Sequence, residues 1–417
     1  MKFIADLHIH SKYSRATSKS MDVEHLSKWA KIKGIDLIGT GDFTHHLWLS
    51  ELKSKLEPMD NGLFDYEGIK FMLTAEVSSI YSKTYSGKKR VYRIHNLIFA
   101  PSFKSVEKIN KALSAIGNLA SDGRPILGLD AEELARIVFD IDENCVIVPA
   151  HIWTPWFSLF GSMSGFDRLE DCFGRQAEKI FCLETGLSSD PAMNWRLSAL
   201  DKYSLISNSD SHSPQKIGRE ANVFDCAQDY FEIRDALKKK DKNRFLYTVE
   251  FFPEEGKYHF DGHRNCKVRF SPEETKRHNR ICPVCDKPVT VGVMNRVDTL
   301  ADRKDGFVPD NAIPFKSLIP LDEVIADVLQ VSKTSKAVGR KYTQTVERFG
   351  TEFRLLLEAP ENEIMDKLDA ELGRAVLQVR SRQVEVNPGF DGEYGTVNIR
   401  EFNGDAGRGH EKQLSFF

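Results

Sequence analysis

The stretch Asp6-Leu7-His8-Ile9-His10 follows the short run Lys2-Phe3-Ile4-Ala5 at the start of the chain. In an extended strand, successive side chains point to opposite faces, so residues 6, 8 and 10 share one face while Leu7 and Ile9 pack behind it. Carboxylate and neutral imidazole are ligands that divalent transition metals prefer in proteins. This stretch therefore predicts a strand whose end points metal-binding side chains in one direction.

The same residue types recur at the ends of other apolar runs or beside them. They are Asp42, His45, His46, Glu76, His95, His151, Asp210 and His212. Any one of them alone is better explained as a turn or capping residue. The whole set, falling at successive strand ends, predicts a multinuclear metal site.

Helical patterns separate these apolar runs, at residues 23–33, 105–116, 131–139, 193–200 and 229–239. Strands that alternate with helices predict an α/β fold with a parallel sheet and crossover connections, either open or closed into a barrel. Functional residues collect at the carboxyl ends of the strands in both forms. We therefore expect the His, Asp and Glu residues to meet at one end of the sheet.

Composition limits the classes of function. The chain has 417 residues, 41% of them hydrophobic, and a formal net charge of −3, which argues against bulk attraction to nucleic acid. The start shows no signal-peptide pattern, and no apolar run approaches the length of a membrane span. Seven cysteines, an odd number, fit a reducing compartment. We expect a cytoplasmic protein that has no membrane partner.

A second metal site is predicted by two residue pairs, His263-Arg-Asn-Cys266 and Cys282-Pro-Val-Cys285. Two pairs with this spacing are typical of turns that close a tetrahedral zinc site. The alternative is a surface histidine beside free thiols, and His259 and His278 are competing donors without the pair spacing. A closed site with four ligands would be structural, ordering residues 251–300 as a zinc-binding module.

The motifs DLHIHS (6–11), GTGDFTH (39–45) and NSDSH (208–212), with the isolated Glu76, His95 and His151, resemble the ordered motifs of the PHP (polymerase and histidinol phosphatase) superfamily. Within it, GTGDFTH, ETGLSSDP (184–191) and NSDSHSP are similar to the endonuclease Q family of DNA-repair enzymes. The resemblance implies a PHP-type distorted (β/α)7 barrel over residues 1–250. It continues through the cysteine module and most of the remaining chain.

The resemblance also implies two or three divalent ions, of zinc, manganese or magnesium. The implied ligands are His8, His10, Glu76 and Asp210 for one ion, Glu76, His95 and His151 for a second, and His212 with either Asp42 or His45 for a third. Asp210, Glu76 and His212 are the expected catalytic residues. Two ions about 3.5–4 Å apart can generate hydroxide, neutralise a phosphate and stabilise the leaving oxygen.

The implied reaction is hydrolysis of the phosphodiester on the 5′ side of uracil, hypoxanthine, xanthine or an abasic site in DNA. Two other classes of function compete with it. A small-molecule phosphoesterase would have no use for the cysteine module. A scaffold without catalysis would not need the apparently complete set of ligands.

Local features could provide DNA contacts. The candidates are the basic residues Lys88, Lys89, Arg90, Lys336 and Arg340 and the aromatic residues Trp153, Trp156 and Phe157. Basic residues bind phosphates, and aromatic rings can stack on a base extruded from the helix. The alternatives are a solvated charged surface and a hydrophobic lid over the end of the sheet.

After the cysteine module, residues 301–402 have a charged, helix-favouring composition, and we expect a mainly helical C-terminal region that faces DNA. Residues 403–417 form a Gly-rich, charged tail that ends in Gln413-Leu414-Ser415-Phe416-Phe417. This ending resembles the pentapeptide that binds the bacterial sliding clamp, with Phe416 in place of the usual Leu. A clamp is therefore an expected partner, and a polar-apolar ending without function is the alternative.

Overall fold

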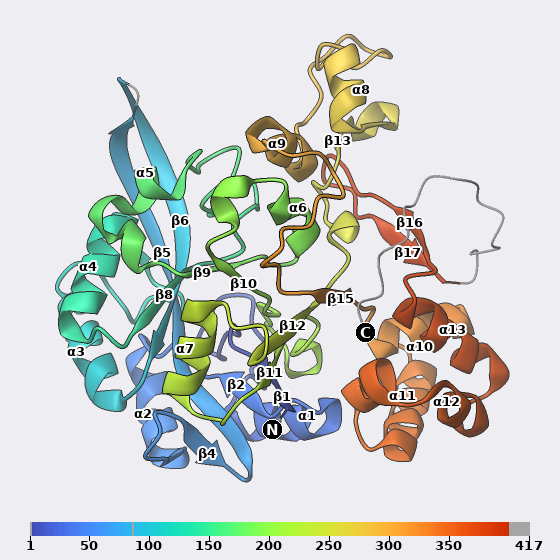
Figure 1. Ribbon diagram of the computed structural model, residues 1–417, viewed down its shortest axis with the longest axis horizontal. Helices are drawn as coiled ribbons and strands as arrows, with labels where there is room; N and C mark the ends of the chain where they lie inside the picture. Colours follow the sequence, from blue (N-terminus) through green and yellow to red (C-terminus); the bar gives the residue numbers. More distant parts are fainter. Residues whose placement is uncertain (1, 86, 400–417) are drawn as a thin grey trace.

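The computed structural model describes residues 2–85 and 87–399. Its centre is a sheet of eleven strands: β1 (Lys2–Asp6), β2 (Leu37–Gly39), β3 (Glu57–Pro58), β4 (Phe64–Tyr66), β5 (Ile69–Tyr85), β6 (Lys88–Ala100), β7 (Ile126–Leu127), β8 (Val146–Pro149), β11 (Ala221–Asp225), β12 (Phe245–Glu250) and β15 (Phe315–Ser317). Its hydrogen-bonded order is β15-β12-β11-β1-β2-β5-β4-β3 (Figure 1). β6 pairs with β5 and β8, and β7 pairs with β5.

The sheet is mixed, whereas the sequence pattern predicted a parallel one. β2 is parallel to β1 and β5, but β11 is antiparallel to β1, and β6 is antiparallel to both β5 and β8. The reason is local, because β5 and β6 follow each other directly and pair as a long hairpin. β9 (Cys182–Glu184) and β10 (Ser204–Ile206) form a separate parallel pair, so the ladder of the described residues does not close into the expected barrel.

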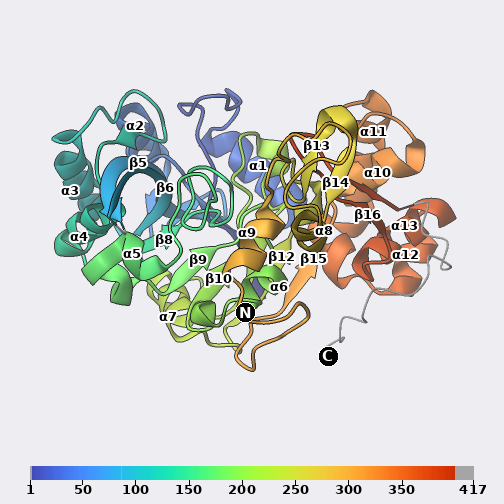
Figure 2. The ribbon, with the colours of Figure 1, turned by 90° about the horizontal axis from the view of Figure 1, so that it is seen from above.

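Helices cover this sheet (Figures 1 and 2): α1 (Val23–Lys33), α2 (His46–Lys55), α3 (Phe103–Ser114), α4 (Ala131–Ile141), α5 (Leu169–Phe173), α6 (Pro191–Trp195) and α7 (Tyr230–Lys239). Short 3₁₀ turns occupy 174–179, 198–200, 214–216, 253–255 and 264–266. α1 has the predicted bounds because both of its ends carry a signal. The Asp22 side chain accepts the backbone N–H of His25, and Gly34 ends the helix at a φ of 84°.

The cysteine module consists of the β13 (Asp261–His263) and β14 (Val268–Phe270) hairpin, α8 (Pro272–Arg277) and α9 (Val293–Leu300). Its own apolar cluster is small and consists of Phe270, Cys282 and Val289. Arg296 on α9 donates hydrogen bonds to the carbonyls of Phe160 and Phe166. The module is therefore attached to the part of the chain that covers the central sheet.

The C-terminal region contains α10 (Leu321–Leu329), α11 (Lys336–Phe349), a π-helical turn (Arg354–Glu358), α12 (Glu361–Lys367) and α13 (Ala370–Arg380). Gly350, with a φ of 85°, ends α11. The β16 (Glu385–Asn387) and β17 (Thr396–Asn398) hairpin then returns to the cysteine module, where Phe260 donates to the Gly389 carbonyl. None of the helices in the described ranges is long and apolar enough to cross a membrane.

A buried ion pair joins the C-terminal helices to α1. Lys33 Nζ lies 2.8 Å from Glu352 Oε2, and each side chain is only 5% exposed. The Tyr342 hydroxyl donates to the same oxygen, and the Leu321 N–H donates to Oε1. Burial alone would raise the pKa of Glu352, but the charge of Lys33 and the Tyr342 hydrogen bond lower it. The carboxylate therefore stays charged in the folded protein.

We predict that Lys33→Met lowers the free energy of unfolding by about 3–5 kcal/mol, because Glu352 keeps a buried charge without its partner. The lowered pKa of Glu352 means that its stabilising contribution is present at neutral pH and is lost as the pH falls below about 4. Urea unfolding at pH 7 measures the effect. Lys31→Met is the matched control, because its exposed contact with Glu67 is worth at most about 1 kcal/mol. Equal midpoints for the two variants would contradict the anchoring role.

Candidate metal centre

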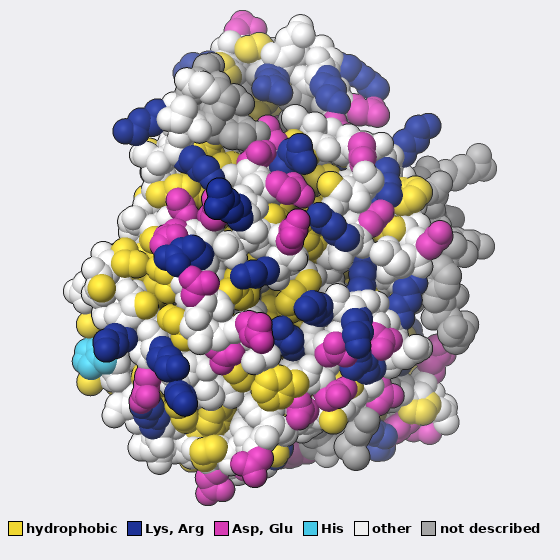
Figure 3. All heavy atoms as spheres, turned by 60° about the vertical axis from the view of Figure 1, so that its left-hand side comes forward, with side chains coloured by type: hydrophobic (Ala, Val, Ile, Leu, Met, Phe, Trp, Pro, Cys, Tyr) yellow, Lys and Arg dark blue, Asp and Glu magenta, His cyan; other side chains and the backbone are white. Residues whose placement is uncertain are grey.

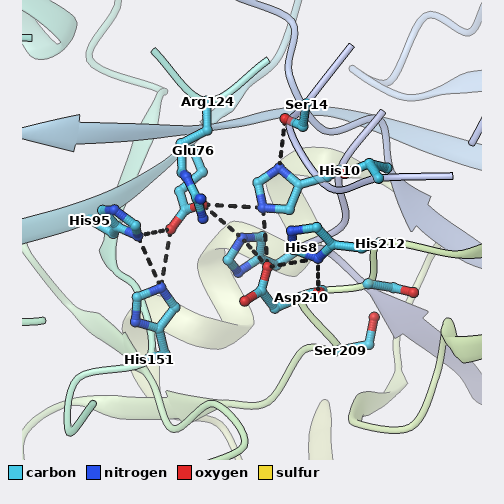
Figure 4. Close-up of polar contacts among 12 residues, drawn as sticks. His8, His10, Ser14, Glu76, His95, Arg124, His151, Ser209, Asp210 and His212 are labelled. Atoms are coloured by element: carbon cyan, nitrogen blue, oxygen red, sulfur yellow. Dashed lines mark hydrogen bonds and ion pairs between the residues drawn. The ribbon is translucent and has the colours of Figure 1, made fainter. Parts of the chain in front are cut away.

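Seven of the nine predicted ligands converge from five strands that are far apart in the sequence (Figure 4). The residues are His8 and His10 after β1, Glu76 in β5, His95 in β6, His151 after β8, and Asp210 and His212 after β10. Two of these positions differ from expectation, because Glu76 and His95 lie inside long strands and not at strand ends. The β5–β6 hairpin thus continues beyond the centre.

The first cluster contains His8, His10, Glu76 and Asp210, whose candidate ligand atoms all lie within 4.8 Å of one another. His10 Nε2 is 3.2 Å from Glu76 Oε2 and 3.1 Å from Asp210 Oδ1. His8 Nε2 is 3.6 Å from each of the same two oxygens. Two imidazoles and two carboxylates therefore face a common point.

The second cluster contains Glu76, His95 and His151. Glu76 Oε1 lies 2.6 Å from His95 Nδ1 and 3.1 Å from His151 Nε2. Glu76 thus turns one oxygen to each cluster. Burial alone would raise the pKa of Glu76, but His95 and Arg124 are among the groups that lower it well below its usual value.

The donor set fits divalent metal ions. In the part of the chain that the structure describes, His8 Nε2, His10 Nε2 and Asp210 Oδ1 are buried and make no hydrogen bond, only the ion-pair contacts with one another and with Glu76. Leaving a buried polar atom unsatisfied costs about 1–3 kcal/mol, yet these three atoms face the same point. A cation bound there would satisfy all of them at once, and imidazole with carboxylate suits zinc and manganese.

Two further carboxylates orient the histidines of the first cluster. Glu184 Oε1 lies 3.0 Å from His8 Nδ1, and Asp42 Oδ1 lies 3.0 Å from His10 Nδ1. In each ring the other nitrogen, Nε2, is the one that faces the cluster. A carboxylate behind a ligating histidine fixes its tautomer and raises its basicity.

Asp6 does not join the cluster, although the strand pattern put it on the same face as His8 and His10. Its Oδ1 accepts the N–H of Ser209, and its Oδ2 accepts the N–H of Gly218. Asp6 is fully buried and both of its oxygens are used by backbone groups. Its function is therefore to hold the loop that carries Asp210.

The residues expected to hold a third ion are not brought together as a ligand cluster within residues 2–85 and 87–399. Besides His10, Asp42 accepts hydrogen bonds from Ser11 and Ser14. The His45 ring stacks on Tyr13, with centroids 4.4 Å apart. His212 lies beside His10, with ring centroids 4.6 Å apart. A third ion stays a prediction, and Asp42 is placed to orient His10.

Backbone strain concentrates at this centre. Asp42, His151 and Asp210 have φ angles of 46°, 31° and 47°, in the left-handed region that non-glycine residues rarely adopt. Each such residue costs of order 1–3 kcal/mol and persists only where its surroundings determine it. Gly186 packs so closely on His151 that an added Cβ would lie 2.4 Å from the His151 Cβ. Local strain therefore orients the side chains of the centre.

Sequence analysis missed two residues of the centre. Arg124 Nη1 lies 3.1 Å from Glu76 Oε2, and its side chain is 30% exposed at the edge of the cluster. Nothing in the sequence around Arg124 indicates this position. Glu184 begins the ETGLSSDP motif (184–191), and the resemblance of that motif to the endonuclease Q family implies no role for this residue. It follows the buried Cys182-Leu183 run of β9, the same signal that identified Glu76, and it could have been found.

The aromatic loop after His151 is divided between core and surface. Trp153 is only 1% exposed and donates its Nε1–H to Asn194 Oδ1, so its burial excludes stacking on a base without rearrangement. Trp156 is 40% exposed and meets Tyr258 edge to face. Phe157 packs on His95, with ring centroids 4.8 Å apart. Trp153 thus belongs to the core, while Trp156 remains accessible.

The four predicted zinc ligands His263, Cys266, Cys282 and Cys285 do lie together, with ligand atoms within 4.8 Å of one another. Their chemistry fits a zinc ion in a closed tetrahedral site. The competing donors are elsewhere. His259 is buried near Asp190, and His278 stacks on Phe270.

The predicted basic contacts lie on different elements. Lys89 and Arg90 are exposed on β6, and Lys336 and Arg340 are exposed on α11. The side chain of Lys88 and the clamp-like residues 413–417 lie outside what the structure describes. Figure 3 shows Lys and Arg interspersed with Asp and Glu over one face of the molecule, without a broad patch of one sign.

We predict that Glu184→Gln weakens metal binding about 10- to 100-fold. Both oxygens of Glu184 face hydrogen-bond donors, and glutamine would replace one of these oxygens with an NH₂ group, which is itself a donor. Those donors are His8 Nδ1, Asn208 Nδ2 and the His151 N–H. Titration with Mn²⁺ monitored by calorimetry measures the loss. The exposed Glu178→Gln is the control. Unchanged affinity in Glu184→Gln would show that Glu184 does not position the ligands.

Two solved structures resemble most of the chain. The lesion-specific endonuclease PfuEndoQ from Pyrococcus furiosus matches with a TM-score of 0.86 and 33% identity, covering 96% of this chain and 97% of that one. A structure of endonuclease Q in complex with a 27-mer duplex substrate, which has an abasic lesion at the active site, matches with a TM-score of 0.83 and 34% identity. This second match has the same coverage. The similarity therefore includes the cysteine module and the C-terminal helices.

Sequence comparison adds one family model and one relative. The family model of the MJ0043 C-terminal domain matches residues 320–383, which contain α10 to α13. The uncharacterized protein MJ0043 of Methanocaldococcus jannaschii is 30% identical over 291 residues. These are 66% of this chain but only 36% of that protein, so the match spans about a third of the relative's length.

Proposed function

The chain belongs to the endonuclease Q family, and on this premise we propose that it is a DNA-repair endonuclease with a multi-metal active site. Its reaction is hydrolysis of the phosphodiester on the 5′ side of uracil, hypoxanthine, xanthine or an abasic site. The observation that carries the proposal is Glu76, which turns one carboxylate oxygen toward each of two histidine clusters. A shared carboxylate suits a pair of ions that act on one phosphate.

In this proposal His8, His10, Glu76 and Asp210 would hold one ion, and Glu76, His95 and His151 would hold another. Bound there, such ions would lower the pKa of a water molecule and would place positive charge beside the phosphate oxygens. Glu184 and Asp42 keep the two β1 histidines oriented. His212, half-buried beside His10, lies next to the reacting groups. Glu76, Asp210 and His212 are the proposed catalytic residues.

Arg124 adds a fixed positive charge at the edge of the centre. Its guanidinium contacts Glu76 and is partly exposed, so it is placed to donate hydrogen bonds to an incoming phosphate. Arginine presents several donors in a planar fork that matches phosphate oxygens. We propose that Arg124 orients the substrate beside the ions.

Lesion recognition is proposed to use Trp156 and Phe157, with Trp156 the accessible ring. Extruding a base costs a few kcal/mol, and stacking on an aromatic face offsets part of this cost. The endonuclease Q complex contains a duplex with an abasic lesion at the active site, which supports damaged DNA as the class of substrate. Lys336 and Arg340, four residues apart on the exposed side of α11, are proposed phosphate contacts.

We retain the distorted (β/α)7 barrel as a proposal for residues 1–250. The β9–β10 pair supports this proposal, because one hydrogen bond connects it to the central sheet. The N–H of Ile152, just after β8, donates to the carbonyl of Glu184 in β9. Residues 251–300 are the proposed zinc-binding module, 301–402 the DNA-facing region, and 403–417 the tail that recruits a sliding clamp. The proposed place of action is the cytoplasm, where the protein meets DNA.

The test is a nicking assay on end-labelled duplexes that contain one uracil, hypoxanthine or abasic site, with Mg²⁺ or Mn²⁺ supplied separately. We expect one cut immediately 5′ of the lesion and none in undamaged duplex. Asp210→Asn should reduce the rate at least about 10³-fold, because a ligand charge is lost while asparagine tolerates the same φ.

The exposed Asp140→Asn on α4 is the control and should cut at the wild-type rate. Two results would contradict the proposal. A wild-type rate in Asp210→Asn would remove Asp210 from the site. Failure to cut any lesion, together with rapid release of phosphate from small monoesters, would favour a small-molecule phosphoesterase.

A further inference from the structure

The β5–β6 hairpin extends well beyond the metal centre that it helps to build. Glu76 and His95 lie within its two strands, and β5 continues for nine residues after Glu76, to Tyr85. Nine residues of strand span about 30 Å. Figure 1 shows the hairpin projecting past the neighbouring helices at the upper left of the molecule. The metal centre and this projection are therefore parts of one continuous element.

One face of the hairpin is packed against the rest of the molecule. The Tyr92 ring stacks on Phe166, with centroids 3.9 Å apart and an angle of 4° between the rings. Lys83 Nζ donates to the Asp171 carbonyl. Because β5 and β6 are supported along this side, the hairpin is a braced arm whose direction is fixed relative to the centre.

The opposite face, which we term the front face, is open over its outer part, whereas Ile80 and Arg93 nearer the centre are partly buried. Side chains alternate along a strand, so this face carries the residues that share the side of Glu76 and His95. The pairs beyond the centre are Ile80 with Arg93, Ser82 with Val91, and Thr84 with Lys89. Val91 is 49% exposed, and Ser82, Thr84 and Lys89 are exposed as well.

The front face is also free of acidic residues of its own. The sequence has no Asp or Glu between Glu76 and Glu107. Lys89 and Arg93 are the basic residues on the front-face side of the pairs described above, whereas Lys83 and Arg90 pair with each other on the packed face. The absence of acidic residues sets this segment apart from the full chain, whose net charge is −3. The Arg93 guanidinium lies over the Phe157 ring, which packs on the ligand His95. Arg93 and Lys89 thus place two positive charges along the front face, beyond the centre.

We propose that the front face of the β5–β6 hairpin is a track for the DNA backbone that flanks the scissile phosphate. This inference rests on the proposed function and specifies how its substrate is held. Lys89 and Arg93 pair with phosphates of this DNA strand, and the hydroxyls of Ser82 and Thr84 donate hydrogen bonds to the backbone of the same DNA strand. Such contacts fix the position of the duplex without reading its sequence.

A rigid track has a mechanistic consequence. A DNA strand whose scissile phosphate lies at the metal centre must leave the centre in some direction. The hairpin gives one such direction, because β5 and β6 both carry ligands of the centre and both continue beyond it. Contacts along about 30 Å correspond to roughly nine base pairs of duplex on one side of the cut. The hairpin would thereby set the register of the strand at Glu76 and His95.

The test compares Lys89→Gln/Arg93→Gln with wild type, both in the full chain carrying Asp210→Asn so that bound DNA stays uncut. Anisotropy gives the affinity for a uracil duplex between 50 and 200 mM salt. Loss of two phosphate contacts should lower the slope of log K against log salt by about 1.8. Hydroxyl-radical footprinting should lose protection over roughly nine base pairs on one side only.

Lys89→Gln alone, which leaves the Phe157 contact of Arg93 intact, should lower the slope by about 0.9. Lys238→Gln/Lys239→Gln, on the exposed side of α7, is the matched control and should change neither slope nor footprint. Slopes and footprints in both hairpin variants equal to those of the Asp210→Asn protein would overturn the track without contradicting the proposed function, which lesion cleavage by the wild type tests separately. A wild-type protein that neither binds nor cuts lesion DNA would instead overturn the proposed function, and the track with it.

Discussion

The structure depends on one buried carboxylate that is shared between two groups of histidines. Moving a charged group out of water costs several kcal/mol, so Glu76 is stable only where opposite charge surrounds it. His95 and Arg124 are among the groups that lower its pKa, and bound ions would provide the larger compensation. Because its two oxygens face different clusters, β1, β8 and the segment after β10 must all approach β5 at one place. The arrangement of the central sheet follows from that requirement.

Precise orientation of the ligands requires a second set of contacts. Glu184 and Asp42 fix the rings of His8 and His10, while Asp6 holds the backbone before Asp210. Strained φ angles at Asp42, His151 and Asp210 are tolerated because these contacts determine them. A site organised in this way has little reorganisation left to make when substrate arrives, which is how preorganised electrostatic catalysis gains its advantage. The braced hairpin extends the same rigidity away from the centre.

Much of the centre could be predicted from sequence, because strand alternation and apolar runs are local signals. His8, His10 and His151 were found in this way. Residues whose role depends on tertiary contacts were not: Arg124 has no local signal, and Asp6 shares a face with His8 yet bonds to a distant loop. The parallel sheet was wrong because the pattern does not distinguish a hairpin from a crossover. Trp153 could not be separated from the other candidate base contacts, because the sequence does not show its burial.

The most direct test of the shared carboxylate is electron paramagnetic resonance of the protein titrated with Mn²⁺. If Glu76 bridges two ions, wild type bound to two equivalents should give the spectrum of a spin-coupled pair. Glu76→Gln should lose the coupling and weaken both sites together, while Glu178→Gln should behave as wild type. Two uncoupled ions in wild type, or loss of a single site in Glu76→Gln, would contradict the account.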